Sequence, residues 1–294
     1  MIEIASVGSS KVDLVFYNLL TDKKHKVNNA HNNEIYMVKY YYFTALNHHL
    51  LLTSSFDKSI KIWNINEDPI NIIVINNCHL RQSLDPFCML FLQDVCYIIG
   101  GCVNRKMRIW DKNLINIGTI NNCELVKYFY IETYYIGNIP LIILCGKPHV
   151  EVLEFKNCRL KKFKDKDYYM DDNSMQVSHN FAELNKIKDT LFLFDADDSG
   201  ILRVFDYETE RLYKRFDTNG IITYSLCMYN EHNLITGGAD ENISIINLDN
   251  FRIVKEYGGF KGSVFNVKKA KLGTEDEEFI ITGCKEGTIK IWKP

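Results

Sequence analysis

The residues with the clearest chemical potential lie in and just before the stretch LLTSSFDKSIKIWN, residues 51–64. The residue types of a nucleophilic triad are present there: Thr53, Ser55, Asp57 and the upstream His31. A nucleophilic hydroxyl must be exposed at a pocket beside its base. These hydroxyls instead lie in an apolar run followed by an alternating segment, a pattern typical of strands. We therefore expect this group to stabilise structure rather than to catalyse a reaction.

A second set of reactive residue types lies further along the chain. His149 occurs in GKPHVEV, and three carboxylates, Asp195, Asp197 and Asp198, cluster in FDADDSG. Such carboxylates can chelate Ca²⁺ or Mg²⁺, so an enzyme or cation site is the alternative of another class. The sequence contains no glycine-rich phosphate loop, H-E-x-x-H motif, nucleophile elbow or kinase signature. We expect no enzymatic activity, no cofactor and no bound metal.

Composition excludes several other classes of protein. The net charge of −2 gives no basic footprint for nucleic acid or an anionic membrane. Nine cysteines without a C-x-x-C pair support neither a disulfide framework nor a zinc site. The N-terminal MIEIASVGSS lacks the basic region of a signal peptide, and no apolar run approaches the length of a membrane helix. An intracellular protein in cytoplasm or nucleus is the expectation.

The phrase at 51–64 recurs along the chain. Its copies include IIGGCVNRKMRIWD and IITGCKEGTIKIWK, together with four weaker versions. The tryptophan position of the phrase steps by 48, 47, 45, 50, 41 and 46 residues between seven anchors: Val15, Trp63, Trp110, Phe155, Phe205, Ile246 and Trp292. A repeat near this length indicates a radial or solenoid architecture.

Each period contains four strand candidates and no helical pattern. An apolar strand, a polar turn and an alternating strand such as SIKIW form the phrase itself, and two further strands lie between successive anchors. We predict an all-β fold, a seven-bladed β-propeller of four-stranded antiparallel blades, occupying residues 1–294 as a single domain.

These repeats resemble the WD-repeat family, most literally in RIWD at Trp110–Asp111. In that family a histidine before the first strand pairs with an acid six residues ahead of the tryptophan. The acid position here holds Ser9, Asp57, Asn104, His149, Ser199, Asp240 and Glu286. The histidine position is filled by His31 and His79, and more loosely by His179, whereas the last two repeats lack it. The resemblance implies a structural relay drawn from His31, Thr53, Ser55, Asp57, Trp63, His79, Asn104, Trp110, Asp240, Glu286 and Trp292.

The two chain ends predict blades with three strands each. The N-terminal repeat starts at IEIAS, which matches a second strand, and the C-terminal repeat stops after its third strand at Trp292. Three readings stay open: a misassigned N-terminus or a missing upstream segment, closure without a shared strand, or a strand donated by a partner at this seam. The last reading resembles the propellers of vesicle coats and nuclear-pore scaffolds.

The leading functional prediction is a non-catalytic scaffold or adaptor that binds other proteins or peptides within an intracellular complex. The long loop 164–177 offers Tyr168, Tyr169 and Met170 as apolar anchors. A reader of phosphorylated or acidic peptides is the alternative, because arginine can hold phosphate in a bidentate manner. Its basic sector comprises Lys58, Arg81, Arg105 and Lys285.

Overall fold

The structure is a computed structural model. It describes residues 3–6, 12–18, 23–43, 48–65, 71–76, 87–92, 95–103, 106–113, 115–121, 127–156, 159–163, 177–218, 220–272 and 277–292. All regular elements in these ranges are β-strands, and within each sheet the strands that follow one another along the chain pair antiparallel. None of the described residues forms a helix long and apolar enough to cross a membrane.

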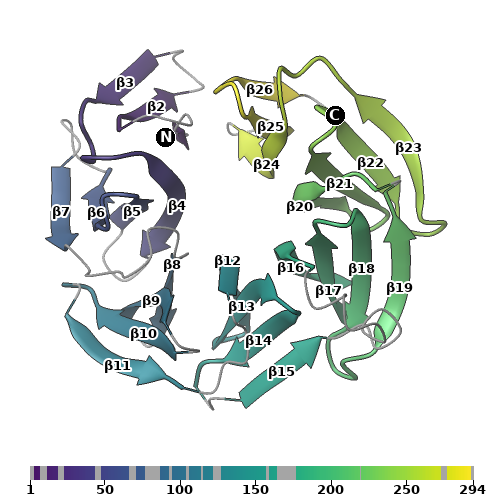
Figure 1. The fold of residues 1–294 in the computed structure, drawn as a ribbon, viewed down its shortest axis with the longest axis horizontal. Helices are drawn as coiled ribbons and strands as arrows, with labels where there is room; N and C mark the ends of the chain where they lie inside the picture. Colours follow the sequence, from purple (N-terminus) through teal and green to yellow (C-terminus); the bar gives the residue numbers. More distant parts are fainter. Residues whose placement is uncertain are drawn as a thin grey trace. The chain divides into compact units, whose positions relative to one another are not determined.

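The chain divides into two compact units, and the first comprises Met1–Glu124 and Ile131–Leu141. It holds three complete sheets whose strands follow chain order (Figure 1). The first sheet has three strands: β1 (Glu3–Ser6), β2 (Leu14–Asn18) and β3 (Lys23–Val27). The second has four: β4 (Ile35–Phe43), β5 (His48–Ser55), β6 (Ile60–Asn64) and β7 (Asn71–Asn76). The third also has four: β8 (Phe87–Leu92), β9 (Val95–Val103), β10 (Lys106–Asp111) and β11 (Asn116–Ile120).

The second unit comprises Leu125–Tyr130 and Ile142–Pro294, so the division passes through the next two strands, β12 (Lys127–Ile136) and β13 (Ile139–Lys147). These strands form one sheet with β14 (Val150–Glu154) and β15 (Arg159–Phe163). Two further four-stranded sheets follow: β16 (His179–Ile187), β17 (Thr190–Asp197), β18 (Ile201–Asp206), β19 (Leu212–Asp217), and then β20 (Thr223–Asn230), β21 (Asn233–Gly238), β22 (Ile243–Asn247), β23 (Arg252–Tyr257). The last sheet has three strands: β24 (Val264–Leu272), β25 (Glu277–Cys284) and β26 (Ile289–Trp292).

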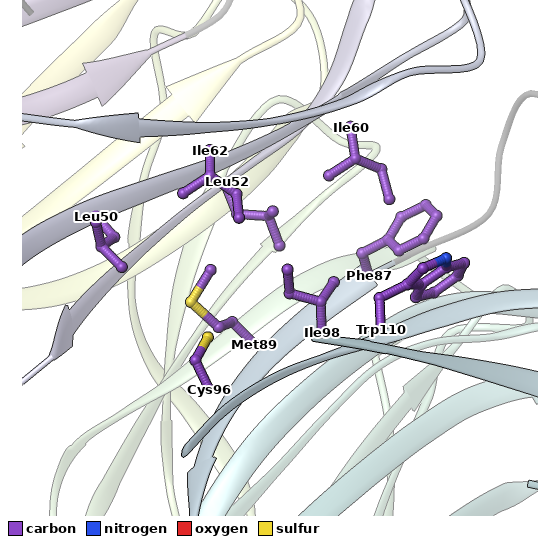
Figure 2. Close-up of a cluster of buried hydrophobic side chains, with 9 residues drawn as sticks. All are labelled: Leu50, Leu52, Ile60, Ile62, Phe87, Met89, Cys96, Ile98 and Trp110. Atoms are coloured by element: carbon purple, nitrogen blue, oxygen red, sulfur yellow. The ribbon is translucent and has the colours of Figure 1, made fainter. Parts of the chain in front are cut away.

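The hydrophobic core lies between the faces of successive sheets. One cluster is formed by side chains of β5 and β6 that pack against side chains of β8, β9 and β10 (Figure 2). Burying both faces requires apolar residues on both sides of the middle strands, which explains continuous runs such as LIILC in place of strict alternation. The outer strands β19 and β23 are instead largely exposed.

The sequence-based anchors lie at equivalent places in their sheets. Six of the seven lie in β2, β6, β10, β18, β22 and β26, whereas Phe155 lies immediately after β14. The three-stranded first and last sheets also match the strand assignment made from the sequence. The all-β class and the four-stranded antiparallel blades are confirmed. A seven-bladed ring and a single domain over 1–294 stay predictions.

Candidate functional site

A chain of buried hydrogen bonds crosses the sheet β4–β7. The indole Nε1–H of Trp63 donates to Thr53 Oγ1 at 2.8 Å, and the same hydroxyl lies 2.8 Å from His31 Nε2. The other ring nitrogen, Nδ1, lies 3.0 Å from Asp57 Oδ2. Asp57 Oδ1 accepts from the Ser59 hydroxyl at 2.6 Å. A neutral His31 satisfies every one of these groups, because the Thr53 hydroxyl can accept from the indole and donate to the ring.

Burial and hydrogen bonding shift the pKa values of the two titratable members. Burial lowers the pKa of His31 below its usual 6.5, against the opposing attraction of Asp57. Burial alone would raise the pKa of Asp57, but hydrogen bonds from Ser59 and Asn32 outweigh it and hold that pKa below 3.8. Both shifts favour the neutral ring beside the carboxylate. The hydroxyl of Thr53 is fully buried, so the residue types of a triad here have no access to a substrate.

In each of five sheets, a residue of the second strand pairs with the residue of the third strand that lies eight positions later in the chain. We call this pair the rung. In the sheet β4–β7 this rung pairs Thr53 with Lys61, whose Nζ donates to the Ala30 carbonyl at 2.5 Å. The last sheet repeats the arrangement. There Thr282 pairs with Lys290, whose Nζ donates to the Gly259 carbonyl at 2.7 Å. Trp292 Nε1 also donates to Thr282 Oγ1, at 3.0 Å.

The sheet β16–β19 carries charged residues on this rung. Asp195 pairs with Arg203, and both side chains are fully buried. Arg203 Nη1 donates to Asp197 Oδ2 at 2.6 Å and lies 3.5 Å from Asp195 Oδ2. His179 Nδ1 lies 2.8 Å from Asp195 Oδ2, and its Nε2 lies 3.1 Å from the Pro148 carbonyl oxygen. Two carboxylates, a guanidinium and an imidazole therefore form one internal network.

This network answers the sequence-based suggestion of an enzyme or cation site. Asp195 and Asp197 are bonded to His179, Arg203 and the turn that follows, where Ser199 donates to Asp197 Oδ1 at 2.7 Å. His149 is also buried, and its Nε2 lies 3.1 Å from Glu151 Oε1. Among the described residues, no group of three or more histidine, cysteine, aspartate or glutamate side chains is arranged so that it could hold a metal ion. We find no arrangement there that favours catalysis.

Two further sheets lack the full relay. In β8–β11 the rung holds Gly100 opposite Arg108, so the second strand supplies no hydroxyl at this position; the buried Trp110 ring lies 5.6 Å from the Phe87 ring in a tilted arrangement. In β20–β23, Thr236 stands opposite Ser244, and Ile246 replaces the tryptophan. A cavity of about 10 Å³ lies at this place, lined by Thr218, Ile221, Thr223, Thr236, Gly238, Asp240, Asn242, Ser244, Ile246 and Ile253.

The remaining predicted relay residues are placed differently. Ser55 donates to the Asn33 carbonyl at 2.9 Å rather than to the ring of His31. Asp240 Oδ2 accepts from Asn242 Nδ2 at 3.1 Å within its own turn. Glu286 is exposed and is not brought to the pair of Thr282 and Trp292. His79 and Asn104 lie outside the described residues.

The predicted partner-binding residues are only partly described. Lys58 and Lys285 are exposed in the turns before β6 and β26. Lys58 adopts φ 67°, the left-handed conformation that Gly200 and Gly287 provide at φ +81° and φ +78° in equivalent turns. The others lie outside the described residues: Arg81, Arg105, Tyr168, Tyr169 and Met170.

Exposed apolar residues, which sequence reasoning missed, gather at hairpins of the first unit. Val95 begins β9 and is 47% exposed, whereas Ile136 and Ile139 flank the β12–β13 turn at 40% and 38%. Tyr135, 40% exposed, accepts from Phe91 N at 2.8 Å and donates to its carbonyl at 3.2 Å, so the two hairpins are in contact. We call Val95, Tyr135, Ile136 and Ile139 the hairpin patch. The segment YYIGNIP was the available signal, because it places apolar residues on both sides of a turn.

Comparison with protein families supports the relay geometry. The family model described as WD domain, G-beta repeat (WD40) matches residues 23–64 and 253–293. These two stretches contain the pairs in which a tryptophan indole donates to a threonine hydroxyl. The chain thus contains WD repeats in these two stretches. No curated protein matches its sequence.

A solved structure supports the fold of this WD-repeat protein over almost its whole length. It is similar to the crystal structure of Chaetomium thermophilum Raptor, with a TM-score of 0.71 and 13% sequence identity. The similarity covers 99% of this chain but 26% of that one. The WD-repeat protein therefore spans about a quarter of the length of this structural relative, and the likeness concerns the fold alone.

Proposed function

We propose that this WD-repeat protein is a non-catalytic scaffold or adaptor that binds other proteins within an intracellular complex. WD-repeat propellers generally bind proteins or peptides and are generally non-catalytic. In this chain the relay residues of the sheet β4–β7 are hydrogen-bonded to one another inside the sheet, as the contacts of Thr53 with Trp63 and His31 illustrate. Rigid sheets of this kind can present a binding surface at low entropic cost.

The hairpin patch is the observation that carries this proposal. In the equivalent hairpins of the second unit, the residues that flank the turn are Ile187 and Thr190 between β16 and β17, and Asn230 and Asn233 between β20 and β21. The β12–β13 hairpin instead has an isoleucine at both flanking positions. A cluster of exposed apolar residues on a folded protein typically marks an interaction site.

The test is affinity capture of the full chain from its native cell, followed by mass spectrometry. We expect the double variant Ile136→Lys/Ile139→Lys to lose a defined set of bound proteins without a change in thermal stability. A matched control, Val254→Lys, alters a residue that is 56% exposed on the outer strand β23. If both variants capture the same proteins as the wild type, the hairpin patch is not the binding surface.

Two other modes of binding stay predictions. The acidic-peptide reader depends on Lys58 and Lys285, which are exposed, and on Arg81 and Arg105, which lie outside the described residues. Steep loss of binding with added salt would support that mode. Strand donation at the three-stranded sheets has more support in the structure, because both sheets carry an edge that lacks a fourth strand within the described ranges.

A further inference from the structure

An exposed aromatic cluster lies on the first strand of the sheet β4–β7 and its neighbour β5. Tyr40 and Tyr42 are 54% and 43% exposed. The Tyr40 hydroxyl lies 2.5 Å from His49 Nδ1, and the ring of Tyr42 lies 4.8 Å from the His49 ring, centroid to centroid. We call these three residues the aromatic cluster. Because its rings hold one another in place, a ligand that covers them loses little side-chain entropy.

The position of Tyr40 is buried in two other sheets, β8–β11 and β16–β19. Tyr40 stands opposite Leu51, which stands opposite the anchor Trp63. In the sheet β8–β11 the equivalent row of paired residues runs from Trp110 through Ile98 to Met89, which is 0% exposed.

The second unit gives the same result. In the sheet β16–β19 the equivalent row of paired residues runs from Phe205 through Leu193 to Leu184, which is 1% exposed. Tyr40 is therefore far more exposed than its counterparts in these two sheets.

The residues that cover Met89 show what Tyr40 lacks. Leu50 and Leu52 pack against Met89 from the middle of the preceding sheet (Figure 2). The first strand of that sheet contributes Met37 and Tyr41 to the same cluster, and the Met89 amide donates to the Tyr41 hydroxyl at 3.0 Å. The first strand of the preceding sheet, β4, thus supplies part of the side chains that bury Met89.

The sheet that precedes β4 has no such strand in the described part of the chain. It consists of β1, β2 and β3, with β1 at its edge and β1 in contact with β4. The missing first strand would pair with the outer edge of β1 and would lie over the face from which Tyr40 and Tyr42 project. An open strand edge beside exposed aromatic side chains offers both backbone and side-chain contacts to an extended peptide.

We propose that the aromatic cluster and the edge of β1 together form a docking site for an extended segment of a partner protein. This inference rests on the proposed function and names its mode of binding. The segment pairs with β1 as a fourth strand and carries apolar or aromatic residues on the face toward the aromatic cluster, at the positions that Met37 and Tyr41 occupy in β4. Its contact face is uncharged, since the aromatic cluster contains no carboxylate or ammonium group. Binding is therefore only weakly dependent on salt.

A labelled peptide with the sequence of residues 178–188, SHNFAELNKIK, is a suitable probe. It spans β16, whose Phe181 covers Leu226 in the next sheet, and it mimics the first strand of a blade. We expect fluorescence anisotropy to detect its binding to the full chain. Tyr40→Asp and Tyr42→Asp should each weaken binding at least tenfold, and Val254→Asp should leave it unchanged. Tyr40→Ser serves as a second variant where the aspartate impairs folding, which circular dichroism would reveal.

Backbone methylation separates strand pairing from simple apolar contact. Two versions of the peptide carry N-methyl groups on alternate amides, so that one version blocks the edge facing β1 and the other blocks the opposite edge. We expect one version to lose binding and the other to retain it. Equal binding of both versions, or binding that Tyr40→Asp leaves unchanged, would overturn the proposal.

Two results would show that the site has another occupant and would overturn the proposal that a partner protein binds there. Slow hydrogen exchange at the amides of residues 3–6 in the isolated chain would mean that the chain itself already covers this edge. A dimer that Tyr40→Asp dissociates would mean that a second copy occupies it. Failure of the capture experiment on the hairpin patch affects neither readout, so the two proposals fail separately.

Discussion

Thr53 illustrates how much one hydroxyl contributes in this protein. It accepts a hydrogen bond from Trp63 Nε1 and faces His31 Nε2, each at 2.8 Å, in a fully buried position. Buried polar groups are costly unless they are bonded, so each member of the relay needs the others. The relay therefore holds the segment before β4, the second strand β5, the turn that follows it and the third strand β6 in one arrangement.

The lowered pKa of His31 predicts a pH dependence of stability. The unfolded chain binds a proton at His31 near pH 6.5, whereas the folded chain resists protonation there because the ring is buried. The contribution of His31 to the free energy of unfolding is thus present above this pH and lost as the pH falls below it. We expect His31→Gln to flatten the decline in urea midpoint between pH 7.5 and pH 5.5.

The control for this measurement is His232→Gln. His232 lies 3.0 Å from Asp249, but the side chains are 60% and 70% exposed, so the solvated pair contributes little. This variant should follow the wild-type profile at every pH. Parallel profiles for His31→Gln and the wild type would contradict the assigned role of the buried ring.

At the scale of the element, the sheet β16–β19 shows a relay rebuilt with charges. We expect Arg203→Met to destabilise the protein by about 3–5 kcal/mol, because it leaves Asp195 and Asp197 buried without their guanidinium partner. Urea unfolding measures this change. Lys186→Met removes a pair with Asp189 whose side chains are 59% and 105% exposed, and it should have almost no effect. Equal effects of the two substitutions would refute the assignment.

The same sheet shows where sequence reasoning succeeded and where it did not. Strand order and the anchor residues followed from the repeated phrase, because alternation and turn residues act locally. For Asp195 and Asp197 the sequence suggested only an alternative of another class, a cation or enzyme site, since three neighbouring acids can form a ligand cluster; it did not reveal their buried network with Arg203. Asp195 precedes Arg203 by eight residues, just as Thr53 precedes Lys61. This equal spacing was the signal in the sequence that Asp195 and Arg203 pair with each other.

The exposure of Tyr40 was beyond the reach of sequence patterns. A tyrosine in an alternating strand can be buried or exposed, and the outcome depends on how many strands the preceding sheet contains. The predicted loop anchors Tyr168, Tyr169 and Met170 lie outside the described residues, so the prediction that they bind a partner stays a prediction. Contacts between distant segments decide such surfaces, and local periodicity carries no information on them.

At the scale of the whole molecule, five buried cysteines report on cooperativity: Cys88, Cys96, Cys145, Cys227 and Cys284. Burial raises the pKa of Cys96 to about 12 and that of Cys227 to about 11, so few reactive thiolates form near neutral pH. We expect at most four of the nine thiols to react with Ellman's reagent before unfolding.

The remaining thiols test the prediction of a single domain. Cys88 and Cys96 belong to the first unit, whereas Cys145, Cys227 and Cys284 belong to the second. If residues 1–294 unfold as one domain, all five should become reactive over one range of urea concentration. Two separate ranges, each exposing the thiols of one unit, would contradict the single-domain prediction. Mass spectrometry of the labelled peptides assigns each thiol to its unit.

The rung that pairs threonine with lysine in two sheets and aspartate with arginine in another has an evolutionary consequence. The two stretches that keep the threonine and tryptophan are the ones that the family model matches. A lineage that exchanges hydroxyls for ion pairs can keep its architecture while its ancestry fades from statistical detection. Surveys of divergent genomes that score residue identity will therefore undercount such chains, whereas surveys that score paired substitutions eight positions apart would recover them.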